Sequence, residues 1–73
     1  MERQVFEIDL DYTGSEVGFI KLCENHGLYA ETNGQGHCVL YGYKEQLLGF
    51  LRSYEYDMQE QDIKDLYPFL TSE

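Results

Sequence analysis

Residues 5–12 read VFEIDLDY, and this stretch decides the fold. Apolar side chains at positions 6, 8, 10 and 12 alternate with carboxylates at positions 7, 9 and 11. A period of two is the pattern of a strand that buries one face and leaves the other in solvent. The stretch therefore predicts a half-buried strand with Glu7, Asp9 and Asp11 on its solvent side.

An amphipathic helix is predicted directly after this strand. Ser15 is a suitable N-cap, with Thr13 as the alternative. At about 100° per residue, the apolar residues between positions 19 and 26 fall on one continuous arc. Gly27 stands where helices commonly end in a C′ glycine. Together these signals predict a helix over residues 15–26.

A hairpin and a second helix are expected next. Residues 28–32 and 37–42 are predicted strands, joined at 33–36 by NGQG, which is typical of a hairpin turn. Residues 43–53 then repeat the helical pattern, with one apolar arc and charged residues opposite.

The last third of the chain carries a shorter alternation. Residues 54–59 read YEYDMQ and are interpreted as a fourth strand, with continuation of the preceding helix as the alternative. One or two final helical turns are expected over 61–67, stopped by Pro68.

The order of these elements predicts the fold. The sequence GFIK at 18–21 resembles GFLR at 49–52, and each lies in a predicted helix that follows a strand. Such an echo is consistent with a β-α-β unit used twice. The order β-α-β-β-α-β is that of the ferredoxin-like fold. We expect a single α+β domain over residues 1–73, in which two helices cover one face of an antiparallel sheet and a short helical tail follows.

Charge is the main indication of function. The chain has 14 acidic and 5 basic residues, a formal net charge of −9, and nearly all of the excess lies in residues 1–12 and 53–73. Binding to phosphates requires basic side chains, so this balance argues against direct contact with nucleic acid or an anionic membrane. It favours a partner protein with a basic surface.

Sequence signals for export or membrane insertion are missing. No stretch approaches the roughly 20 apolar residues of a membrane span, and the N-terminal MERQ lacks the order of a signal peptide. We therefore expect a cytoplasmic protein in which Cys23 and Cys38 are reduced thiols.

The predicted topology gathers the carboxylates. In a ferredoxin-like sheet the first and last strands are neighbours, so Glu55 and Asp57 should share the open face with Glu7, Asp9 and Asp11. Like charges facing each other across strands destabilise a sheet by about 0.2–1 kcal/mol per pair. Recognition of a basic protein would offset that cost. Plain solvation of the surface and binding of a hard metal ion are the alternatives.

Catalytic and metal-binding chemistry is weakly supported. Cys23 lies on the apolar arc of its helix, where a thiol is usually an inert small hydrophobe. His37 and Cys38 are adjacent on a predicted strand and should point to opposite faces, which suits neither a shared zinc ion nor a catalytic pair. We expect no enzymatic activity, no cofactor and no metal site.

The tyrosines complete the prediction. There are seven in 73 residues, too many for one small core, and an exposed tyrosine is a favoured interface anchor. Tyr29 and Tyr56 are the anchors expected beside the carboxylates. The sequence thus predicts a non-catalytic acidic module that binds a basic protein. In its sharpest form it is a nucleic-acid-mimicking inhibitor, by analogy of size and charge with accessory proteins of phages and mobile elements. The alternative is a small regulatory or structural homodimer joined through a tyrosine-bearing sheet surface, with room for a small ligand.

Overall fold

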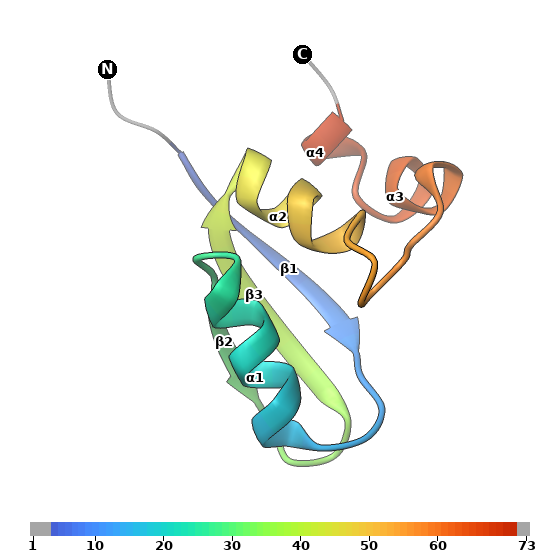
Figure 1. The fold of residues 1–73 in the computed structure, drawn as a ribbon. Helices are drawn as coiled ribbons and strands as arrows, with labels where there is room; N and C mark the ends of the chain where they lie inside the picture. Colours follow the sequence, from blue (N-terminus) through green and yellow to red (C-terminus); the bar gives the residue numbers. More distant parts are fainter. Residues whose placement is uncertain (1–3, 72–73) are drawn as a thin grey trace.

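The computed structural model describes residues 4–71 as a three-stranded sheet with four helices (Figure 1). In chain order the elements are β1 (Val5–Asp11), α1 (Glu16–Asn25), β2 (Tyr29–Thr32), β3 (His37–Tyr43), α2 (Lys44–Leu51), α3 (Glu60–Leu66) and α4 (Pro68–Thr71). The expected α+β class and antiparallel sheet are confirmed. Within residues 4–71, every helix falls short of the length and apolar character needed to cross a membrane.

The sheet has the order β1-β3-β2, and both pairings are antiparallel. Leu40 of β3 lies opposite Ile8 on one side and Ala30 on the other. Ile8, Leu10 and Leu40 are almost completely buried, whereas the residues that alternate with them on β1 are exposed. The period of two in residues 5–12 therefore orients β1 as predicted.

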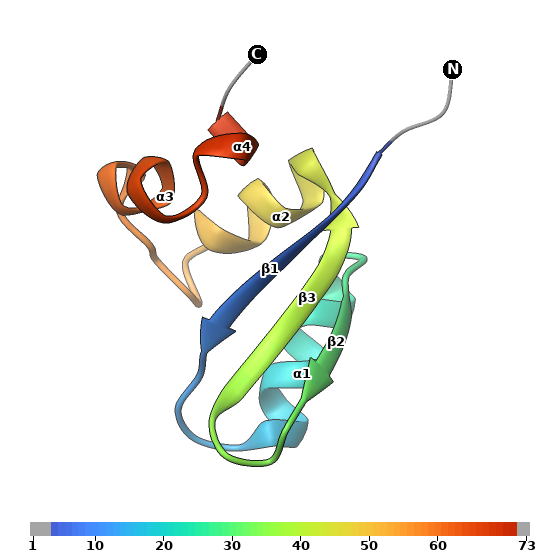
Figure 2. The same cartoon turned by 180° about the vertical axis from the view of Figure 1, so that it is seen from behind.

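Both α1 and α2 lie on the same side of the sheet, as predicted, and Figure 2 shows that no helix of the described residues 4–71 covers the opposite face. The apolar arcs of the helices meet the inner face of the sheet in one core. Its fully buried members include Cys23, Cys38, Leu40, Leu47 and Phe50.

The ends of α1 follow the sequence signals closely. The Ser15 hydroxyl accepts a hydrogen bond from the backbone N–H of Gly18 at 3.2 Å, which confirms it as the N-cap. At the other end Gly27 has a φ of 76°. The N–H groups of Gly27 and Leu28 donate to the carbonyls of Glu24 and Cys23, which is the Schellman arrangement.

The fourth strand predicted over residues 54–59 is wrong. The N–H groups of Tyr56 and Asp57 both donate to the carbonyl of Ser53, at 3.2 and 2.6 Å, and Asp57 adopts a left-handed φ of 54°. These bonds form a turn after α2, so neither a strand nor a longer helix can form there. The guanidinium of Arg52 then holds Glu60 through two bonds of 2.6 and 2.9 Å, which draws the start of α3 back to the end of α2.

The sixth element of the order β-α-β-β-α-β is consequently not formed within residues 4–71. The helical turns expected over 61–67 are present as α3. The helix α3 ends before Pro68, as predicted. Pro68 also starts α4, which was not predicted, because its fixed φ suits the first position of a helix.

Side chains of the C-terminal segment cover the edge of β1 where a fourth strand would pair. The hydroxyl of Tyr67 donates to the carbonyl of Asp9 at 2.6 Å, and that of Tyr56 donates to the carbonyl of Asp11 at 3.3 Å. Phe69 stacks on Phe6 with 6.0 Å between the ring centroids. Hydroxyl donors thus replace part of a strand ladder and protect the edge from pairing with other chains.

Two glycines, one in α2 and one in β3, test how closely the side chains around them pack. A Cβ atom added at Gly49 would meet nothing within 4 Å, and glycine costs a helix about 0.5–1 kcal/mol relative to alanine. We expect Gly49→Ala to raise the free energy of unfolding by about that amount. At Gly42 a Cβ would collide with the side chain of Leu28, so Gly42→Ala should destabilise by about 1–3 kcal/mol. Denaturant titration of both variants measures the difference in their free energies of unfolding. Equal effects would contradict the close contact of Gly42 with Leu28 and the open space at Gly49.

Candidate functional site

The uncovered face of the sheet is the candidate site, and we call it the open face. It consists of the odd-numbered residues of the three strands, because successive side chains of a strand point to opposite sides. Its members are Val5, Glu7, Asp9, Asp11, Tyr29, Glu31, His37, Val39, Tyr41 and Tyr43. The three strands contribute no lysine or arginine.

The pairing register places the carboxylates on the outer strands and the aromatic and apolar residues at the centre. Tyr41 of β3 lies between Glu7 and Tyr29. One step along the strand, Val39 lies between Asp9 and Glu31. The open face is therefore a tyrosine- and valine-bearing centre bordered by carboxylates on both sides.

A chain of contacts orients the centre. The hydroxyl of Tyr41 donates to Oε1 of Glu31 at 2.8 Å, and the Tyr29 ring lies 5.8 Å from the Tyr41 ring. The hydrogen bond to the Glu31 carboxylate, with a smaller contribution from burial, raises the pKa of Tyr41 to about 12. Tyr41 is thus a neutral donor at physiological pH and fixes the position of Glu31. The Tyr29 side chain is left 64% exposed.

The end of the open face carries a histidine. Nδ1 of His37 lies 3.1 Å from Oδ1 of Asp11, with side-chain exposures of 44% for His37 and 88% for Asp11. When protonated, His37 supplies a positive charge directly beside Asp11. No other described residue of the open face can become positive.

The structure brings together four of the seven residues predicted to bind a partner. Glu7, Asp9, Asp11 and Tyr29 share the open face. Glu55, Tyr56 and Asp57 do not, because they belong to the turn after α2. The prediction of five carboxylates on one face is therefore wrong.

Tyr56 is half-buried instead. Its ring lies 5.0 Å from that of Phe50, and its hydroxyl contacts the carbonyl of Asp11. Glu55 and Asp57 are exposed at the turn.

Six members of the open face lie outside the set predicted to bind a partner: Val5, Glu31, His37, Val39, Tyr41 and Tyr43. Glu31 has the parity of Tyr29, and Tyr41 the parity opposite to the buried Leu40. The burial of Leu40 therefore indicates that the neighbouring Tyr41 points to the open face. Glu31 lies across the sheet from Asp9 because β3 pairs with both β1 and β2. Local sequence patterns do not specify these pairings.

The cysteines lie on the opposite side of the sheet from the open face. Cys23 and Cys38 are both free and fully buried. Burial, reinforced by the neighbouring Cys38 thiol, raises the pKa of Cys23 to about 12, which keeps it protonated and unreactive at neutral pH. Within residues 4–71, His, Cys, Asp and Glu side chains form no group of three or more that could hold a metal ion.

Comparison of the chain with models of protein families, with curated proteins and with solved structures finds no match.

Buried phenols and thiols make the fold sensitive to alkali. Burial raises the pKa of Tyr67 to about 12 from 10.0, and Cys23 moves to about 12 from 9.0. A raised folded-state pKa means that stability is complete below the unfolded value and is lost as pH rises through the folded value. We expect stability to fall between about pH 9 and pH 12.

Midpoints of denaturant unfolding, measured across this pH range, give the loss of stability. In Tyr67→Phe the stability should fall less steeply with pH. The same variant should cost about 0.5–1.5 kcal/mol at neutral pH, because the hydrogen bond to Asp9 is removed. Ionisation of Tyr67 near pH 10 in the folded protein, without a loss of stability, would contradict this prediction.

Proposed function

We propose that the protein is a non-catalytic acidic interaction module whose open face binds a basic surface of another protein. The observation that carries the proposal is an uncovered sheet face on which Glu7, Asp9, Asp11 and Glu31 surround an aromatic centre without any lysine or arginine. Protein interfaces commonly combine a central tyrosine with a charged, solvated rim.

Electrostatics supports a basic partner. The net charge of −9 creates a field that attracts a positive protein before contact and raises the association rate. Solvation alone would account for the carboxylates, but it leaves the exposed Tyr29 ring beside Tyr41 without a role.

The sharpest form of the proposal is competition with nucleic acid. The carboxylates of β1 recur at every second residue, about 6.7 Å apart along the strand. One strand of DNA carries a phosphate about every 3.4 Å along the axis, so the row of β1 has roughly half that linear charge density. Glu31, on the far side of β3, adds one further carboxylate beside this row. An inhibitor of this kind, of the phage or mobile-element type, would act in the cytoplasm on a nucleic-acid-binding protein.

The fold supports the open face as a binding surface. The first five elements keep the β-α-β-β-α order of a ferredoxin-like arrangement, in which both helices occupy one side. On the other side, no helix of the described residues stands between the sheet and an approaching partner.

A homodimer through the open face is the second candidate. Tyr29, Tyr41 and Tyr43, with Val5 at 58% exposure, supply apolar contact area for it. Two copies would also bring their carboxylates together, so this dimer should form at high salt or low pH and weaken at low salt. A basic partner has the opposite salt dependence.

Capture tests the proposal. The immobilised protein is exposed to a lysate of its source cells at low salt, and bound proteins are released by rising salt or by added duplex DNA and RNA. A basic protein released by moderate salt is the expected result, and release by nucleic acid would support mimicry. Recovery of only the protein itself, retained at high salt, would replace the proposal by the homodimer.

A further inference from the structure

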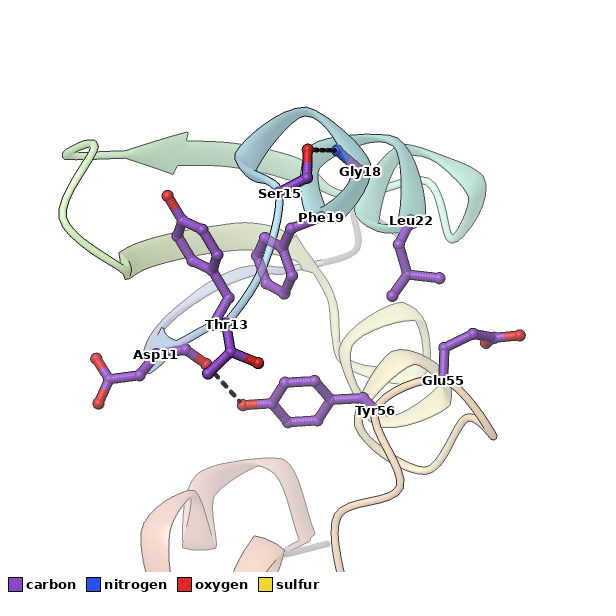
Figure 3. Close-up of a pocket in the computed structure, with 9 residues that line it drawn as sticks. Asp11, Thr13, Ser15, Gly18, Phe19, Leu22, Glu55 and Tyr56 are labelled. Carbon is purple, nitrogen blue, oxygen red and sulfur yellow. Dashed lines mark hydrogen bonds between the residues drawn. The ribbon is translucent and has the colours of Figure 1, made fainter.

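A groove of about 440 Å³ lies between the start of α1 and the turn that follows α2 (Figure 3). Phe19 and Leu22 of α1 form one wall, and Tyr56 of the turn forms the other. Its volume is within the range of about 300–1,000 Å³ typical of ligand sites. The groove lies beside the C-terminal end of β1 and shares Asp11 with the open face.

The groove exists because residues 54–57 form a turn instead of a strand. A strand paired with β1 would place backbone where the Tyr56 ring now lies. The ring is held by Phe50, 5.0 Å away, and by its hydrogen bond to the carbonyl of Asp11. Phe19 is held by stacking on Tyr12 at 4.7 Å. Both walls are therefore positioned before any ligand binds, which lowers the entropic cost of binding.

The charged residues that line the groove are both acidic. Its two ends carry the carboxylates of Asp11 and Glu55, and Figure 3 shows them directed outward on opposite sides of Phe19 and Tyr56. The Asp11 carboxylate also lies 3.1 Å from Nδ1 of His37 on the open face. The residues that line it include no lysine, arginine or histidine. An apolar middle with an anionic group at each end is complementary to an apolar side chain with cations on both sides.

We propose that the groove binds a short segment of a basic polypeptide in which an apolar side chain is flanked by lysine or arginine. The apolar side chain packs between Leu22 and Tyr56, and the flanking cations pair with Asp11 and Glu55. The inference rests on the proposed function for the basic character of the partner, and it adds an anchor that the open face does not provide.

Three capped tripeptides test this directly. N-acetyl-Lys-Phe-Lys-amide has both features, N-acetyl-Lys-Ala-Lys-amide has only the charges, and N-acetyl-Gln-Phe-Gln-amide has only the ring. Backbone amide NMR follows each titration. We expect the first peptide to shift the signals of Gly18, Leu22 and Tyr56 and to bind at least about fivefold more tightly than either control, because ring burial and charge pairing both contribute. Equal binding of all three peptides, or shifts outside the groove, would overturn the inference.

A matched pair of variants adds a second readout. Gly18 lines the groove, and a Cβ there would meet Ser15 only at an ordinary 3.7 Å, so Gly18→Leu places a side chain in the groove. Gly49→Leu makes the same replacement in the middle of α2, away from the groove. Gly18→Leu should abolish binding of the first peptide, and Gly49→Leu should preserve it. Unchanged binding by folded Gly18→Leu would exclude the groove.

The outcomes separate the two proposals. If the peptides fail but a basic protein still binds the open face, the groove inference is wrong and the proposed function stands. If the peptide binds in the groove while neutralising the open face leaves capture unchanged, the proposed role of the open face is wrong.

Discussion

Phe50→Ala is expected to destabilise the protein by about 3–5 kcal/mol, since a large buried aromatic side chain is lost and a cavity remains. Phe50 is fully buried, and its ring lies 5.9 Å from Phe19, 5.6 Å from His26 and 5.0 Å from Tyr56. It therefore joins α1, α2 and the turn after α2. A domain of this size has a total stability of only about 4–11 kcal/mol, so the variant should be largely unfolded or close to it.

Thermal and denaturant unfolding measure this loss. Tyr54→Ala is the control, because the Tyr54 side chain is 93% exposed and its removal should change stability by less than about 0.5 kcal/mol. Similar unfolding midpoints for Phe50→Ala and Tyr54→Ala would show that the aromatic cluster does not hold the core together.

Neutralising the open face should have the largest effect on binding. The triple variant Glu7→Gln, Asp9→Asn and Glu31→Gln keeps the shapes of the side chains and removes three negative charges. Exposed ion pairs contribute up to about 1 kcal/mol each, so affinity for a captured basic protein should fall about 10-fold to 100-fold. The dependence of affinity on salt should become shallower as well. Asp11 is left unchanged because it also belongs to the groove.

A second triple variant controls for net charge. Glu24→Gln, Asp62→Asn and Asp65→Asn remove the same charge from exposed positions on α1 and α3, away from the open face. It should retain nearly the affinity of the original protein, measured by titration calorimetry at several salt concentrations. Equal losses in the two triple variants would mean that overall charge, and not the open face, governs binding.

Much of the fold could be predicted because its signals are local. The alternation of residues 5–12 specifies which face of β1 is buried, and Ser15 and Gly27 mark the ends of α1 through hydrogen bonds within a few residues. The NGQG turn at 33–36 brings β2 and β3 together for the same reason.

The segment 54–59 could not be predicted in this way. Its alternation fits a strand, but a strand needs the edge of β1, and the hydroxyls of Tyr56 and Tyr67 occupy that edge. The turn bonds to Ser53 and the ion pair between Arg52 and Glu60 also favour the turn. Contacts between residues as far apart as Asp9 and Tyr67 decide whether residues 54–59 form a strand or a turn. A short sequence window does not contain such contacts.

The candidate site was predictable to the same extent. Glu7, Asp9 and Asp11 follow from the period of β1 alone. The position of Glu31 depends on the sheet order β1-β3-β2, and that of Glu55 on the turn. Local pattern thus identified the acidic strand, whereas its neighbours were set by long-range pairing.

Amide NMR of the labelled protein with a captured basic protein tests the central claim most directly. We expect the largest signal changes at Glu7, Asp9, Glu31 and Tyr41, with smaller changes along the outer faces of α1 and α2. Changes confined to α3 and α4, with the three strands unaffected, would show that the open face is not the binding surface.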